Sequence, residues 1–198
     1  MATQSFWLFL QLGLEHITDL RGYDHILFLA ALAAPRLEQP RQLFWLVTAF
    51  TLGHSLTLAL STYRLIEVSP PLVEFIIPCT ILITCLLNLR LVYLGREAPT
   101  GTREQFFSYM LVTVFGLVHG LGFSSYLKAL LGHTDSIFTE LLAFNLGVEV
   151  GQVAVVLGFW VIGRIFTRYS LLTTRGWNLA ISSPASVLAL WLMVTRIV

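Results

Sequence analysis

The first strongly apolar part of the chain contains, at residues 13–29, the sequence GLEHITDLRGYDHILFL. Ionisable side chains recur through this stretch, although each of them costs several kcal/mol inside a bilayer unless it finds a partner. The adjacent pair Asp24-His25 is its sharpest feature, because a carboxylate and an imidazole can both bind a divalent metal. We therefore predict a functional site here. The other charged side chains of the stretch are expected at the membrane surface: Glu15, Asp19 and Arg21.

A second histidine, His16, precedes His25 by nine residues. On a straight α-helix nine residues turn by about 900°, which would place the two imidazoles on opposite faces. Gly22 lies between them and can bend or locally unwind a helix. The spacing alone therefore leaves open whether both histidines bind one ion.

Composition identifies the class of protein. Of 198 residues, 56% are hydrophobic and 12% are charged, and the mean hydropathy is +0.78. Average soluble proteins carry about 25% charged residues, and about 20 apolar residues suffice to span a bilayer. We predict an all-α, polytopic transmembrane helical bundle with a single domain over residues 1–198. A net charge of +1 without a basic run argues against a nucleic-acid partner.

The chain divides into apolar segments separated by short polar breaks that leave no room for another domain. Each segment is long enough to span a bilayer, so about six spans are expected. The six segments are residues 8–34, 42–62, 71–91, 106–128, 137–163 and 179–197.

Charge placement predicts the orientation of these spans. The first, third and fifth connections carry eight arginines, against three basic residues on the opposite side. By the positive-inside rule, the arginine-rich connections are cytoplasmic and both termini lie outside. The eight are Arg36, Arg41, Arg90, Arg96, Arg103, Arg164, Arg168 and Arg175, and the three are Arg64, Lys128 and Arg196.

Three further segments carry metal-competent groups at similar depth. His54, His119 and Glu149 each lie about 18–20 Å from the start of their segment, near the bilayer midplane. The two histidines also share the frame Phe-x-Leu-x-His-x-Leu, in FTLGHSL and FGLVHGL. We expect Asp24, His25, His54 and His119 to converge on a common centre. His133 and Asp135 lie in a predicted loop and are expected to be solvated.

The fifth segment contains FNLGVEVGQ at residues 144–152, which places Asn145, Glu149 and Gln152 on one helical face. Such a stripe fits either a cation site or a polar seam between helices. The carboxylate favours the cation site, since a lone buried glutamate is pushed toward its neutral form. The many glycines beside these motifs favour close helix packing and are compatible with a homo-oligomer.

Together these motifs resemble the HupE/UreJ family of small membrane proteins, in the branch similar to nickel or cobalt permeases. The resemblance rests on GLEHITDLRGYDHILFL, TAFTLGHSLTLAL, VEFIIP, VFGLVHGLGF and LLAFNLGVEVGQ, in that order along the chain. It implies a helical membrane protein that handles a divalent transition metal. The family's motif positions correspond to His16, Gly22, Asp24, His25, His54 and His119, and its polar stripe to Asn145, Glu149 and Gln152.

Our first hypothesis is a secondary permease for nickel, cobalt or zinc in the plasma (inner) membrane of a prokaryote. Its partners would be the lipid bilayer and the ion. The alternatives are an intramembrane hydrolase with Glu149 or Asp24 as general base, or an assembly factor with a structural metal. The predicted metal ligands are His16, Asp24, His25, His54, His119 and Glu149, with Asn145 and Gln152 as weaker ligands or orienting groups.

Overall fold

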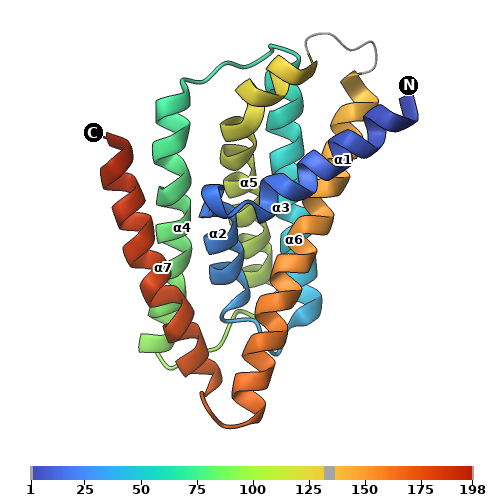
Figure 1. Ribbon diagram of the computed structural model, residues 1–198. Helices are drawn as coiled ribbons and strands as arrows, with labels where there is room; N and C mark the ends of the chain where they lie inside the picture. Colours follow the sequence, from blue (N-terminus) through green and yellow to red (C-terminus); the bar gives the residue numbers. More distant parts are fainter. Residues whose placement is uncertain (1, 132–136, 198) are drawn as a thin grey trace.

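The structure is a computed structural model that describes residues 2–131 and 137–197. This part of the chain contains seven α-helices, one 3₁₀ turn and no strand, which confirms the all-α prediction. Figure 1 shows α3 to α7 as an upright bundle, with α1 slanting into it and α2 at its centre. The elements are α1 (Ala2–Thr18), η1 (Leu20–Gly22), α2 (Asp24–Ala33), α3 (Pro40–Thr62), α4 (Pro70–Tyr93), α5 (Thr102–Leu131), α6 (Ile137–Arg168) and α7 (Thr174–Ile197).

Five helices, α3 to α7, are long and apolar enough to cross a bilayer. The predicted first segment, residues 8–34, is not one helix: α1 has 17 residues, α2 has 10, and η1 separates them. The helix is thus interrupted at Gly22, the position where the sequence allowed a bend. Each piece is shorter than the roughly 20 residues that a full crossing requires. α1 begins at the end of the bundle where both termini lie, and α2 continues from it toward the opposite end (Figure 1).

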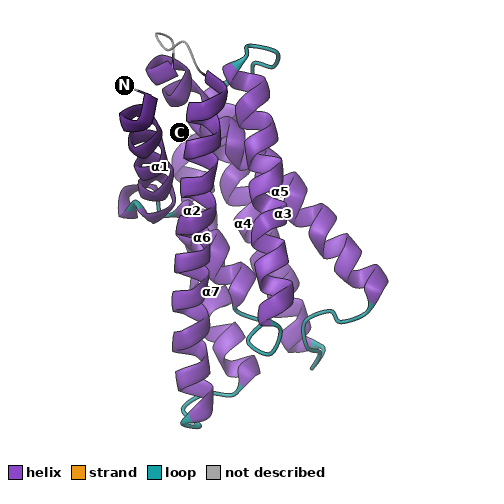
Figure 2. Cartoon of the chain, turned by 90° about the vertical axis from the view of Figure 1, so that its right-hand side faces the viewer, coloured by secondary structure: helices purple, strands orange, loops and turns teal. Residues whose placement is uncertain are grey.

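Glycines bring two pairs of helices into backbone contact. A Cβ atom added to Gly13 of α1 would lie 2.0 Å from the carbonyl oxygen of Phe144 in α6. One added to Gly116 of α5 would lie 2.2 Å from the carbonyl oxygen of Phe50 in α3. Figure 2 shows α1 lying beside the upper part of α6. Small residues permit this close approach in membranes, and here it joins helices of one chain, so these glycines give no support for a homo-oligomer.

We expect Gly147→Ala to destabilise the protein, because its Cβ would lie 2.0 Å from the backbone oxygen of Leu10. Overpacking of this kind costs about 1–3 kcal/mol. The matched control is Gly158→Ala on the same helix, whose Cβ would meet nothing within 4 Å. Thermal unfolding of the purified variants in detergent should show a lower midpoint for the first variant alone. Equal midpoints would contradict the tight α1–α6 contact.

The two termini lie at the same end of the bundle (Figure 1). The connections after α2, α4 and α6 lie at the opposite end, and the eight arginines counted in the sequence lie in them or in the adjoining helix turns. We refer to the two ends as the terminal end and the arginine-rich end.

Candidate metal centre

The break between α1 and α2 brings His16 and His25 together. His16 lies in the last turn of α1, and His25 is the second residue of α2. Because the chain turns through η1 between them, their ring centroids lie only 4.6 Å apart. On a straight helix the nine-residue spacing would keep the two rings apart. Because the helix is broken between them, both rings can belong to one site.

His54 of α3 completes a cluster of three imidazoles. Ligand nitrogens of His16, His25 and His54 all lie within 4.8 Å of one another. Metal–nitrogen bonds of about 2.1 Å place tetrahedral ligands about 3.4 Å apart, so a movement of about 1 Å would seat an ion. His54 is fully buried, and His25 is 6% exposed. Three separate helices therefore contribute one imidazole each to the same point, two of them buried and that of His16 half-buried.

The nitrogens of this cluster lack hydrogen-bond partners in the described part of the chain. They are Nε2 of His16, Nε2 of His25 and both ring nitrogens of His54. A buried polar atom without a partner costs about 1–3 kcal/mol, so several together are unusual unless something else binds them. A metal ion coordinated by these nitrogens would remove that cost.

Asp24 orients His25 and is not one of the three clustered ligands. Its Oδ1 lies 3.2 Å from Nδ1 of His25, which fixes the other nitrogen, Nε2, as the atom facing the cluster. Its Oδ2 accepts a hydrogen bond of 3.1 Å from Nη2 of Arg196. Arg196 also donates from Nη1 to the carbonyl oxygen of Glu74, at 2.8 Å. Residue spacing could not predict this contact of Arg196, because a basic residue is common in the last turn of a helix.

His119 of α5 lies beside the cluster with one free nitrogen. Its ring centroid is 5.0 Å from that of His25. Its Nε2 lies 2.9 Å from Oγ1 of Thr80, whose own proton is donated to the carbonyl oxygen of Ile77. Thr80 must therefore accept from His119, so Nε2 carries the proton and Nδ1 keeps a lone pair. That Nδ1 is buried and has no partner among the described residues, which makes His119 available as a fourth ligand.

The polar stripe of α6 faces α3 and forms a seam of side-chain hydrogen bonds. Glu149 does not join the imidazole cluster in this structure. Its partner Thr48 lies six residues before His54, which is about 9 Å along the helix. A direct ligand role would require Glu149 to leave that hydroxyl. The three bonds of the seam are Thr48 to Glu149 at 2.8 Å, Thr51 to Gln152 at 2.7 Å and Ser55 to Asn145 at 2.7 Å.

An open cavity of about 820 Å³ reaches the cluster from the terminal end of the bundle. His16, His25 and His119 line its inner part. Its lining comes from the end of α1, from η1 and from α2, α4, α5 and α7, and it is rich in carboxylates, which concentrate cations. Arg196 is the cation among the described lining side chains. The lining carboxylates are Glu15, Asp19, Asp24 and Glu74.

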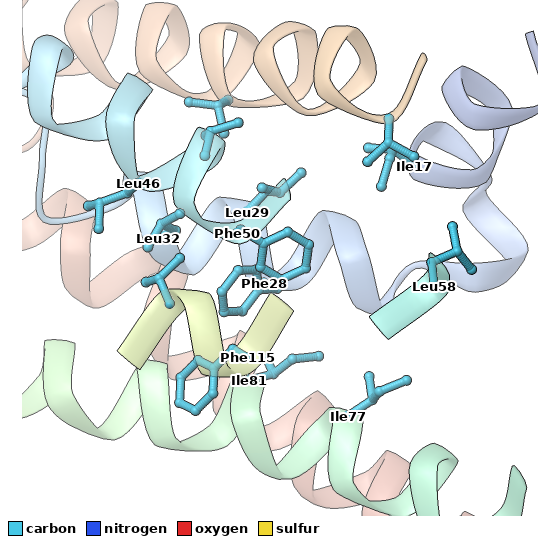
Figure 3. Close-up of a cluster of buried hydrophobic side chains, with 14 of the residues drawn as sticks. Ile17, Phe28, Leu29, Leu32, Leu46, Phe50, Leu58, Ile77, Ile81 and Phe115 are labelled. Atoms are coloured by element: carbon cyan, nitrogen blue, oxygen red, sulfur yellow. The ribbon is translucent and has the colours of Figure 1, made fainter. Parts of the chain in front are cut away.

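Aromatic side chains close the cluster on the other side. Three phenylalanines lie one helical turn from three of the histidines, on the side toward the arginine-rich end. Phe28 of α2 follows His25, Phe50 of α3 precedes His54, and Phe115 of α5 precedes His119. Ring centroids are 5.0 Å apart for Phe28 and Phe50, and 6.1 Å for Phe28 and Phe115. Figure 3 shows these rings within the buried core. All three are 5% exposed or less, so they form an apolar plug beneath the histidines.

His133 and Asp135 lie outside the described residues. The remaining sequence-predicted groups fall into three places: His16, His25 and His54 in the cluster with His119 beside it, Asp24 against His25, and Asn145, Glu149 and Gln152 in the seam. Other residues that the sequence did not assign to the site also contact its members or close it on one side. They are Thr80, Arg196 and the three phenylalanines of the plug.

Comparison with known proteins gives one result. A family model described as HupE / UreJ protein matches residues 1–196. Neither the curated proteins nor the solved structures give a match. The match covers nearly all of the chain and includes every helix of the cluster. With its long apolar helices, this chain is an integral membrane protein and belongs to the HupE/UreJ family.

Proposed function

We propose that the protein is a secondary permease that binds a divalent transition metal at the histidine cluster and moves it across the membrane. One observation carries the proposal: a carboxylate-lined cavity ends at buried imidazoles whose nitrogens have no partner among the described residues. Carboxylates attract the cation into the cavity, and neutral imidazoles then replace its hydration shell. The ion is the substrate of this protein, not a permanent part of it.

The proposed ligands are His16, His25 and His54, with His119 available as a fourth. Imidazole suits nickel, cobalt, copper and zinc, and the resemblance to permeases of the HupE/UreJ family favours nickel or cobalt. Asp24 holds His25 in the orientation that binding requires. Glu149 remains a proposed contributor from the seam, either as a late ligand or as a polar group beside the path.

We place the arginine-rich end in the cytoplasm and both termini outside, following the positive-inside rule. On this placement α1 and α2 together form a sixth, interrupted crossing, in the plasma membrane of a prokaryote. Broken helices at a binding site are a recurrent feature of secondary transporters. The cavity then opens outward and the phenylalanine plug closes the inner side, so transport requires Phe28, Phe50 and Phe115 to separate.

The two alternatives fit these contacts less well. A hydrolase needs a carboxylate free to act as base beside the ion, but Asp24 is bound to His25 and Arg196. Glu149 is bound to Thr48, about 9 Å along the helix from His54. A structural metal in an assembly factor needs a closed site, and here an open cavity reaches the histidines. These placements support a carrier.

The test is uptake of radioactive nickel or cobalt into sealed proteoliposomes that contain only this protein. We expect time-dependent uptake that exceeds that of protein-free vesicles and requires an imposed ion or proton gradient. Tight stoichiometric binding without uptake, under either sign of proton gradient, would reject the carrier and favour the hydrolase.

A further inference from the structure

A second cavity, of about 550 Å³, lies at the arginine-rich end between α2, α4 and α5. Its lining contains one carboxylate, Glu104, against four guanidinium groups. No ion pair involves any of these four arginines among the described residues. The cavity is therefore strongly cationic. The four arginines are Arg36, Arg90, Arg96 and Arg103.

Arg36 marks the inner part of this cavity. The residue is only 7% exposed, and its Nη1 donates to the carbonyl oxygen of Leu32 at 2.8 Å. Its Nε has no hydrogen-bond partner in the described chain. Burial lowers the pKa of Arg36 to about 10, so the group is still charged at neutral pH. A buried charge without a counter-ion is strongly destabilising. An anion bound beside this guanidinium would remove that cost.

The walls of the cavity are apolar and continue onto the outside of the bundle. Leu87 is 40% exposed, Leu94 is 46% exposed and Phe107 is 62% exposed. Leu87 and Phe107 belong to α4 and α5, two of the helices that can cross the bilayer, and Leu94 directly follows α4. The part of the cavity that is lined by arginines thus continues into an apolar surface.

The positive charge of this cavity makes it unsuitable as the cytoplasmic part of a path for metal cations. Four unpaired arginines repel a divalent cation, whereas they attract phosphate, which guanidinium groups bind through paired hydrogen bonds. A soluble anion would use the arginines but leave the adjoining apolar walls without a role. An anionic phospholipid uses both, and basic pockets between transmembrane helices are known to bind such headgroups.

We propose that this cavity binds one anionic phospholipid, with its phosphate against Arg36, Arg96 and Arg103 and an acyl chain along Leu87 and Phe107. The lipid supplies the counter-ion that Arg36 lacks and holds α2 against α4 and α5. Because α2 also carries His25, the lipid stabilises the helix that presents the cluster. The proposal does not depend on metal transport, since it rests on a different set of residues.

The test is native mass spectrometry and thermal unfolding of the purified full chain, with phosphatidylglycerol, phosphatidylcholine or inorganic phosphate added. The test variant is Arg96→Gln/Arg103→Gln, which changes two exposed side chains of the cavity. Its matched control, Arg41→Gln/Arg168→Gln, removes two exposed arginines at the same end that do not line the cavity. Arg36→Gln serves as a second variant if it folds.

We expect one phosphatidylglycerol to bind and to raise the unfolding midpoint, with phosphatidylcholine at least about tenfold weaker. Each lost arginine should weaken this binding about fivefold, so the test variant should lose about 25-fold and the control little. Equal binding of the two lipids, or an equal loss in the control, would overturn the proposal. Full stabilisation by inorganic phosphate alone would also overturn it, because the occupant would then be a free anion.

Discussion

The His54→Ala variant is expected to bind nickel or cobalt at least about 100-fold more weakly than the wild type. His54 is fully buried, and its ring nitrogens have no partner that meets hydrogen-bond geometry in the described part of the chain, so both are available to a metal. Loss of a group that merely orients a ligand already costs about 10- to 100-fold, and loss of a ligand should cost at least as much. Isothermal titration of the purified protein with each metal measures the affinity.

The control for this variant is Leu52→Ala, which shortens a side chain on the same helix that is 66% exposed and points away from the bundle. Its metal affinity should match that of the wild type, and circular dichroism should show that both variants fold. Unchanged metal affinity in a folded His54→Ala protein would remove this histidine from the site.

The Asp24→Asn variant should lower metal affinity by about 10- to 100-fold, the range typical for groups that orient a metal ligand. The amide keeps the shape of the side chain but loses the charge that holds the Nδ1 proton of His25 and pairs with Arg196. Some loss of stability is also expected, because Asp24 is buried and Arg196 would lose its counter-ion. Titration calorimetry and thermal unfolding together measure the two effects.

Arg196→Gln provides the matched comparison, since it removes the other partner of the same ion pair. Here we expect metal affinity to rise by about fivefold, because the variant removes a positive charge near the ion and frees a carboxylate oxygen. Opposite signs for the two variants are the signature of an electrostatic role. If both substitutions weakened metal binding equally, the pair would act only by holding α2 and α7 in place.

The stripe on α6 shows where sequence reasoning stopped. The spacing of Asn145, Glu149 and Gln152 correctly placed them on one face, yet it could not say what that face contacts. The structure sets it against the hydroxyls of α3, which was the less favoured of the two predicted arrangements. A hydroxyl partner on another helix leaves no trace in the spacing of the stripe itself.

The repeated frame Phe-x-Leu-x-His-x-Leu is a second example. The sequence showed that Phe50 and His54 match Phe115 and His119, and depth arithmetic placed both histidines near the midplane. Their phenylalanines looked like ordinary apolar residues. In the structure each lies one turn below its histidine and packs against Phe28, so the frame encodes a ligand and a barrier together. This meaning depends on helix direction and on contact between helices.

The sequence by itself determined the membrane class, the all-α fold and the HupE/UreJ family. It could do so because hydropathy, charge and motif order are local properties of the chain. Only the tertiary structure decided that His16 and His25 share a site, that Asp24 turns toward Arg196 and that Glu149 lies in a seam. The physical reason is that a broken helix and side-chain pairing between distant helices depend on packing, as at Gly13 and Phe144, which residue spacing does not encode.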